Sequence, residues 1–359
     1  MSRFVSSRYR QLSVLWVLLA AMVALVASGG SSARPTAAAA APPKKATAKQ
    51  WKALIAKAKQ EGSVTIYSIQ APTNLADLAA KFKDKYGINV TVNRKADNDL
   101  LPQINAEISS GNVQADVWIA TVKRYVLGAL KNGWVADAVG PDFFNKRYDR
   151  SKLIIGKSWI NGSAILGMSW NTQAFPKGIK DIPDFLDPAF RNGKLGMSDA
   201  RISSSQVDWY LWLEKTYGKG IIEKFAAMKP KIYGSSLTAA QAVASGEIIG
   251  APQTAGSTTL ELKDKGAPVE YKLANKGKNW NAAYIGMILK KAPHPAAAQL
   301  LADYIVTPEG QALIDKGLGS AYPKVPGTFY SPPRVPRAND LSPEKVKAFT
   351  DRWTKLFLG

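Results

Sequence analysis

Segments with helical periodicity alternate with short apolar runs along most of the chain. Apolar residues recur three and four positions apart over 51–58, Gly62 follows as a helix terminator, and an apolar run over 64–67 comes next. The same order returns with a helical segment over 73–86 and an apolar run over 88–92. Strands that alternate with helices in this way predict parallel α/β sheets.

The alternation continues towards the C-terminus. Further helices are expected over 100–110, 122–131, 204–217, 221–228, 239–245, 295–306, 308–316 and 343–357. Further strands are expected over 115–119, 164–170, 194–197, 247–251 and 282–290. A chain of 359 residues with 46% hydrophobic content can bury more than one core, so the pattern predicts two α/β lobes.

The N-terminus has the layout of an export signal. Residues 1–10 carry three arginines and no acid, and residues 12–27 form an apolar run that precedes small residues. This pattern predicts a signal peptide over 1–33. An uncleaved membrane anchor is the competing interpretation, although a run of roughly 16 apolar residues is short for a span.

The remaining sequence divides into a linker, two lobes and an extension. Residues 34–49 mix Ala, Pro and Lys without periodicity and are expected to be a disordered tether. We expect residues 50–170 and 282–325 to form lobe 1 and residues 171–281 to form lobe 2. Residues 326–359 are expected to be a C-terminal extension whose helix packs on the lobes.

Composition excludes several classes of protein. The chain has no cysteine, so it has no disulfide, thiol nucleophile, cysteine metal site or acceptor for a lipid anchor. We therefore expect a secreted or periplasmic protein without a lipid anchor. The formal net charge is +21, but the excess is mostly scattered lysine outside any arginine-rich arm. It is expected to steer anions rather than to bind nucleic acid.

Several segments, in this order and spacing, are similar to one known family. They are WKALIAKAKQEGSVTIY (51–67), AEISSGNVQADV (106–117), SWNT (169–172), DPAFRNGK (187–194), ASGEI (244–248), AAQLLADYIVTPEGQ (297–311) and the segment 342–357. The chain resembles the family 1 extracellular solute-binding proteins of ABC transporters, especially the ferric-ion-type branch, which has the type 2 periplasmic-binding-protein fold.

This resemblance implies an architecture and a set of partners. Each lobe is expected to be a mixed, mostly parallel sheet flanked by helices, with the ligand cleft between the lobes. The chain is expected to cross between lobes near Asn171 and again near Trp280. The implied protein is a monomer without a cofactor that closes on a small ligand and delivers it to an ABC permease with its ATPase.

Candidate ligand contacts lie at strand ends and helix starts. The resemblance implies that the loop after the first strand contacts the ligand. Three hydroxyls beside an arginine at the start of helix 204–217 could bind an anion. Other polar residues lie at strand ends, where open α/β sheets bind ligands. Helix caps, surface pairs and core packing are the competing interpretations. The candidates are Ser68, Gln70, Thr73, Arg94, Thr121, Trp170, Arg201, Ser203, Ser204, Ser205, Gln253 and Thr254.

The sequence departs from the ferric-ion pattern of this family. Those relatives bind the metal through an adjacent tyrosine pair, often with a histidine and a glutamate. The corresponding places here read Pro252–Ala255, Ala71 and Thr121, none of which is a hard anionic ligand. We therefore expect no metal site and an organic carboxylate or phosphorus-containing anion as the ligand. Ferric ion with a synergistic anion is the alternative.

Two other classes of function were weighed. A serine hydrolase needs a base beside its nucleophile, but the one histidine, His294, lies between two prolines and the chain has no G-x-S-x-G segment. We therefore expect no enzymatic activity and no partner for His294. A sensor or adhesion module that uses the same clamp without transport remains open.

Overall fold

The computed structural model describes residues 44–274, 279–335 and 341–359. The predicted signal peptide and residues 34–43 of the predicted linker lie outside the described residues. The helices are α1 (Ala48–Glu61), α2 (Pro72–Tyr86), α3 (Asp97–Ser110), α4 (Lys123–Lys131), α5 (Arg150–Leu153), α6 (Ser204–Tyr217), α7 (Ile221–Ala227), α8 (Ser236–Ala244), α9 (Gly256–Asp264), α10 (Pro295–Ile305), α11 (Pro308–Ile314) and α12 (Pro343–Phe357). The strands are β1 (Ser63–Ser68), β2 (Asn89–Arg94), β3 (Val117–Ala120), β4 (Val135–Ala136), β5 (Ile154–Ile155), β6 (Ser158–Asn171), β7 (Gly196–Ser198), β8 (Lys231–Tyr233), β9 (Gly250–Ala255), β10 (Val269–Lys272), β11 (Asn281–Leu289) and β12 (Gly319–Ser320).

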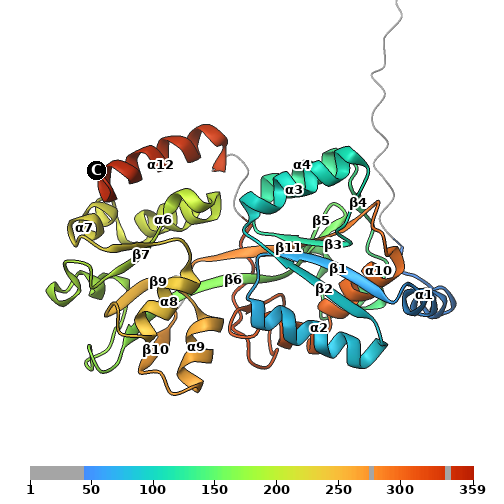
Figure 1. Cartoon of the computed structure of the whole chain (residues 1–359), viewed down its shortest axis with the longest axis horizontal. Coiled ribbons are helices and arrows are strands. Elements are labelled where there is room, and N and C mark those ends of the chain that lie inside the picture. Colours follow the sequence, from blue (N-terminus) through green and yellow to red (C-terminus); the bar gives the residue numbers. More distant parts are fainter. Residues whose placement is uncertain (1–43, 275–278, 336–340) are drawn as a thin grey trace, which may run out of the picture. The chain divides into compact units, whose positions relative to one another are not determined.

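One mixed sheet runs through the described body in the order β10-β6-β11-β3-β1-β2. Strand β1 pairs in parallel with both β2 and β3, as the alternation with α2 and α3 predicted. Strand β11 is antiparallel to β3 and to the long strand β6, which also pairs with β9 and β10 (Figure 1). The predicted mixed α/β fold is therefore confirmed.

Two separate hydrophobic cores define two lobes. The first lobe packs around buried residues of β1, β3, α2 and α10, such as Ile66 and Leu301. The second lobe packs around β7, α6, α7 and α12, including Trp209 and Trp353, and includes a smaller cluster of α8, β9 and β10. The C-terminal helix α12 thus packs on the second lobe.

The paired strands β6 and β11 contribute to both cores. Ile160 of β6 belongs to the first core and Leu166 to the second, while Ala282 of β11 belongs to the second core and Tyr284 to the first. The chain therefore changes lobe within β6, before the crossing expected near Asn171, and again close to the crossing expected near Trp280. Each strand has residues in both lobes because it is long enough to continue through the junction.

Several element ends differ from the expected ones. Helix α1 begins at Ala48, two residues before residue 50, because Thr47 forms a capping box with Gln50. Helix α2 begins at Pro72, one residue before the expected segment 73–86, because the fixed φ of proline suits the first helical position. The amide of Asn74 donates hydrogen bonds to the carbonyls of α11 and the loop after it.

The region after α8 shows the largest difference. The strand expected over 247–251 lies at Gly250–Ala255, and α9 and β10 were not predicted. All six residues of β9 are buried, so the strand has no polar alternation that would mark its bounds. No helix in the described part of the chain combines the length and the apolarity needed to cross a bilayer.

Candidate functional site

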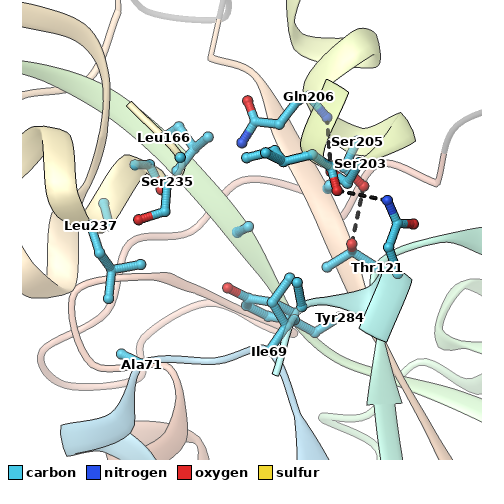
Figure 2. A pocket seen from close by; sticks show the side chains of 18 of the residues that line it. Ile69, Ala71, Thr121, Leu166, Ser203, Ser205, Gln206, Ser235, Leu237 and Tyr284 are labelled. Carbon is cyan, nitrogen blue, oxygen red and sulfur yellow. Dashed lines mark hydrogen bonds between the residues drawn. The ribbon is translucent and has the colours of Figure 1, made fainter. Parts of the chain in front are cut away.

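A cavity of about 500 Å³ lies between the two lobes. Its wall includes residues of the first lobe, residues of the second lobe, and Ala164, Leu166 and Ala282 of the two connecting strands. Apolar side chains such as Ile69 and Leu237 face one another across it (Figure 2). The volume is within the range of small-molecule sites.

Several helices begin at the wall of this cavity. The lining includes Ala71 before α2, Ser203 and Ser205 at α6, Ser235 before α8, and Ala255 before α9. Neither α2 nor α9 has a side-chain cap. Helix N-termini present unpaired N–H groups and the positive ends of the helix dipoles, so the wall favours a negatively charged ligand.

Arg94 is a cavity residue whose charge no described carboxylate neutralises. Its guanidinium donates to the carbonyl oxygens of Ile69 at 3.3 Å and Gln70 at 3.4 Å, and it forms no ion pair within the described residues. These two bonds hold the cation at the C-terminal edge of β1 and β2. Arg94 was predicted, and the structure places it on the cavity wall.

Arg201 also lines the cavity, but its charge is already paired. Its guanidinium donates to the carboxylate of Asp199 at distances of 2.6 to 3.1 Å. Burial alone would raise the pKa of Asp199, but the hydrogen bonds from Arg201 hold this pKa below its ordinary value. The guanidinium also lies 5.8 Å from the ring centroid of Trp353. Arg201 therefore lies on the cavity wall as a residue whose charge is balanced by Asp199.

Two of the three predicted serines beside Arg201 make hydrogen bonds within the protein. The hydroxyl of Ser203 caps α6 by accepting from the Gln206 N–H. Ser204 is buried and does not line the cavity. The hydroxyl of Ser205 lies 3.0 Å from that of Thr121 in the other lobe (Figure 2). At the start of α6, Ser203 and Ser205 therefore form internal bonds, whereas the buried Ser204 hydroxyl has no partner among the described residues.

Thr121 is the centre of a short chain of hydrogen bonds. Its backbone and side chain both donate to the carboxylate of Asp97, which is fully buried. Burial raises the pKa of Asp97 to about 6, and the bonds from Thr121 oppose this rise. Asn98 adds a second contact between lobes by donating to the Ile202 carbonyl at 2.7 Å. These bonds join the lobes on the α6 side of the cavity.

Three candidates near β1 do not line the main cavity. Ser68 and Gln70 are fully buried, and the Gln70 amide donates to the Asp315 carboxylate at 3.0 Å. Thr73 lines a second cavity of about 600 Å³ beside α9, together with Lys316. The loop after β1 therefore turns its polar side chains away from the main cavity, which instead meets Ile69 and Ala71.

Three further candidates face the protein interior. Trp170 packs in the second core, where its ring lies beside Gly178. Gln253 and Thr254 were expected to follow a strand but lie within β9. Thr254 donates to the Gly167 carbonyl at 3.1 Å, and Gln253 donates to the side-chain oxygen of Gln206 at 2.5 Å. The residues after the strand are in fact Gly256 and Ser257.

The structure adds cavity residues that the sequence analysis missed. They are Ile69, Asn98, Gln206, Ser235, Ser236, Ser257 and Tyr284. Ser235 could have been found, because a serine before the helix 239–245 is a typical N-cap. The hydroxyl of Tyr284 points into the cavity from β11 (Figure 2). Burial raises the pKa of Tyr284 above the ordinary value, so its hydroxyl stays protonated and can donate.

The cavity does not present a set of ligands for a trivalent metal. Among the described residues, no three His, Cys, Asp or Glu side chains are grouped so that they could hold a metal ion. The cavity wall contains one carboxylate, Asp99, and one phenol, Tyr284, within the part of the chain that the structure describes. Hard cations need several anionic oxygen ligands, which this wall does not supply.

His294 has partners, contrary to the sequence analysis. Its Nδ1 lies 3.0 Å from the Asp116 carboxylate and its Nε2 lies 3.0 Å from the Ser63 hydroxyl. The same buried carboxylate accepts from the backbone N–H groups of Thr65 and His294, both at 2.7 Å. Asp116, the residue before β3, thus joins β1 to the start of α10.

This Ser-His-Asp arrangement lies away from the cavity. Ser63 is the first residue of β1, whereas the cavity lies beyond the last. The carboxylate of Glu61 accepts from the N–H groups of Ala296 and Ala297 at 3.3 and 2.8 Å. The neighbouring N–H groups are therefore already bound to a carboxylate. A hydrolase would need such N–H groups free to stabilise an oxyanion. Through Asp116 the arrangement anchors the start of α10 to β1.

A two-lobed α/β fold with a ligand-sized cavity between its lobes defines the class of ligand-capturing binding proteins. Residues 64–317 match the family of bacterial extracellular solute-binding proteins, and this protein belongs to that family. The family consists of solute-binding proteins rather than enzymes. None of the curated protein sequences is significantly similar to the chain.

Several solved structures share the fold. Iron-bound HitA from Pseudomonas aeruginosa has 20% identity and a TM-score of 0.61, over 82% of this chain and 99% of that one. AfuA from Actinobacillus pleuropneumoniae with fructose-6-phosphate has 21% identity and a TM-score of 0.62, over 83% and 99%. The substrate binding protein of the ABC transporter from Agrobacterium tumefaciens has 15% identity and a TM-score of 0.65, over 83% and 96%. At these identities the likeness establishes the fold alone.

Proposed function

We propose that this protein is the extracytoplasmic solute-binding subunit of an ABC importer and that it captures a small organic anion between its lobes. Membership of the extracellular solute-binding family supports a binding role outside the cytoplasm. One structural neighbour is itself the substrate binding protein of an ABC transporter. We propose that the protein acts as a monomer, without a lipid anchor, after loss of its signal peptide.

The positive charge at the cavity is the observation that favours an anion as the ligand. Arg94 contributes a cation that is not neutralised within the described residues, and several helix N-termini add positive dipole ends. Apolar residues such as Leu166 and Leu237 line other parts of the wall and suit a carbon skeleton. An organic carboxylate or a phosphorus-containing anion satisfies both features.

Ferric ion is the second candidate ligand, because iron-bound HitA has the same fold. The cavity wall of this protein offers Asp99 and Tyr284 as its anionic oxygen ligands among the described residues. These two groups fall short of the ligands that a trivalent ion needs, even with an accompanying anion. The organic anion is therefore favoured.

Thermal-shift and calorimetric titration of the full-length chain would test the proposal. We expect citrate or inorganic phosphate to raise the melting temperature, whereas ferric ion and uncharged glycerol leave it unchanged. Arg94→Ala is expected to weaken anion binding by about tenfold, the loss of one charged contact of roughly 1.4 kcal/mol. Arg191→Ala is the matched control, because Arg191 is exposed and lies outside the cavity. Binding of ferric ion or glycerol without any anion would contradict the proposal.

A further inference from the structure

Two largely buried serines at the cavity have hydroxyls without a protein partner. Ser236 is the first residue of α8 and Ser257 is the second residue of α9, and each side chain is 9% exposed. Both residues line the main cavity. Neither hydroxyl makes a hydrogen bond with another residue of the described chain. Their hydroxyl oxygens are not among the fully buried unpaired atoms, so both groups are accessible and available to donate to a ligand.

The helices that carry these serines add backbone donors. Helices α8 and α9 have nine residues each and pack against one another. In α8 the Ser235 hydroxyl accepts from the Thr238 N–H, which leaves the earlier N–H groups of the first turn without a side-chain cap. In α9 no side chain caps the helix. Each N-terminus therefore offers N–H groups in addition to its serine hydroxyl.

The contrast with α6 locates the anion-binding part of the wall. At α6 the hydroxyl of Ser203 caps the helix, that of Ser205 bonds to Thr121, and Arg201 pairs with Asp199. At α8 the Ser235 hydroxyl also caps its helix, but the hydroxyls of Ser236 and Ser257 make no hydrogen bond with another described residue. The anion is therefore expected at α8 and α9 rather than at the serine loop before α6.

The charge of this wall matches a dianion better than a monoanion. Each helix N-terminus acts as roughly half a positive charge, so α8, α9 and the cation of Arg94 together supply about +2. Among the described residues, the second lobe contributes no carboxylate to the cavity wall, because Asp99 belongs to α3 in the first lobe. Phosphate monoesters and phosphonates carry a charge between about −1.5 and −2 near neutral pH and have three acceptor oxygens.

We propose that the N-termini of α8 and α9, with the hydroxyls of Ser236 and Ser257, form a subsite for the phosphoryl or phosphonyl group of an organic ligand. This inference rests on the proposed role as an organic-anion receptor. Tyr284 is 6% exposed as a residue, and its hydroxyl faces the same cavity from the first lobe, where it supplies a further donor. The apolar wall at Leu166 and Leu237 then receives the rest of the ligand.

Matched pairs of probes distinguish this subsite from a general anion site. Calorimetric titration of the full-length chain would compare methylphosphonate with acetate and phenylphosphonate with benzoate. We expect each phosphonate to bind at least tenfold more tightly than its carboxylate partner. Ser236→Ala and Ser257→Ala are each expected to weaken phosphonate binding by five- to tenfold. Ser245→Ala is the control, because Ser245 lies at the other end of α8 and outside the cavity lining, and it is expected to leave phosphonate binding unchanged.

The other outcomes separate the two proposals. If the carboxylates bind and the phosphonates do not, the subsite is wrong while the organic-anion function stands. If phosphonates bind but only Ser203→Ala or Ser205→Ala weakens them, the location at α8 and α9 is wrong. No response to either phosphonate or to inorganic phosphate at millimolar concentration overturns the subsite. Binding of uncharged solutes alone overturns the organic-anion function as well.

Discussion

The hydroxyl of Thr121 in the first lobe lies 3.0 Å from the hydroxyl of Ser205 in the second, and Thr121 also donates to the buried carboxylate of Asp97. The Thr121 hydroxyl donates its hydrogen to Asp97. In its contact with Ser205 it can therefore only accept, and the Ser205 hydroxyl is the donor. The contact between lobes is therefore the outer end of a directed chain that terminates in a buried carboxylate. Removal of the Thr121 hydroxyl takes a hydrogen-bond donor from the Asp97 carboxylate, whereas removal of the Ser205 hydroxyl does not.

The first prediction follows from this difference. Ser205→Ala removes only the outer bond and is expected to lower the free energy of unfolding by about 1 kcal/mol. Thr121→Val also leaves the carboxylate of Asp97 without its side-chain donor and is expected to cost about 2 to 3 kcal/mol. Urea denaturation followed by circular dichroism would measure both. Equal losses in the two variants would show that Asp97 does not depend on the Thr121 hydroxyl.

The second prediction concerns Asp303, whose pKa burial raises to about 7. The folded state therefore holds this proton at pH values where an unfolded aspartate has lost it. The contribution to stability is full below about pH 3.8, and it is lost progressively as the pH rises from there to about 7. Asp303→Asn retains the carbonyl that accepts from the Asp142 N–H and removes the ionisation.

The measurement is the change in melting temperature between pH 5 and pH 8. The Asp303→Asn chain is expected to lose less stability over this interval than the unaltered chain, by up to a few kcal/mol. Asp264→Asn, which alters an exposed carboxylate, is the control and is expected to follow the unaltered chain. Parallel curves for all three proteins would mean that Asp303 does not titrate in this range.

The third prediction concerns the anchor formed by Asp116 and His294. The carboxylate of Asp116 is fully buried and accepts from two backbone N–H groups as well as from the imidazole. His294→Ala removes one of these donors and is expected to lower the free energy of unfolding by about 1 to 3 kcal/mol. Ser63→Ala removes only the outermost hydroxyl and is expected to cost less than about 1 kcal/mol.

The same variants test the hydrolase alternative. We expect p-nitrophenyl acetate to be hydrolysed no faster in the presence of the purified chain than in buffer alone. The same is expected for the Ser63→Ala chain. An ester hydrolysis rate that falls on Ser63→Ala and on His294→Ala would show that the Ser-His-Asp arrangement is catalytic. The carboxylate of Glu61 on the neighbouring N–H groups argues against that outcome.

The parts of the fold that depend on local chemistry could be predicted. Gly62 and Gly87 end α1 and α2 in the left-handed conformation, with φ of 69° and 74°, as glycine after a helix suggests. The start of α6 at Ser203 and Ser204 follows from the same kind of local signal. In these cases a residue and its chain neighbours decide the outcome.

The parts of the site that depend on the approach of distant segments could not be predicted. Strand β11 is buried along its whole length, and the direction of the Tyr284 hydroxyl follows from the pairing of β11 with β6. Ser205 was expected to face a ligand, yet its hydroxyl lies 3.0 Å from that of Thr121, which the other lobe brings beside it. Gln253 was placed at a strand end, because nothing in a fully buried strand marks where it stops.

The fourth prediction concerns Gly317, which lies against the first turn of α9. A Cβ at Gly317 would come within 2.6 Å of the Ser257 Cα, and the residue has a φ of +68°. Gly317→Ala therefore adds both backbone strain and a clash between the loop after α11 and the helix that carries Ser257. We expect it to lower the free energy of unfolding by about 2 to 4 kcal/mol and to weaken phosphonate binding.

Gly327 provides the matched control for this contact. It has a similar φ of +72°, but the nearest atom to an added Cβ is a side-chain carbon of Lys316 at 3.8 Å. Gly327→Ala therefore adds the backbone strain without the clash and is expected to cost about 1 kcal/mol. The difference between the two variants, measured by urea denaturation, isolates the approach of Gly317 to α9. Equal losses in stability, with equal phosphonate affinities, would show that this close approach does not position Ser257.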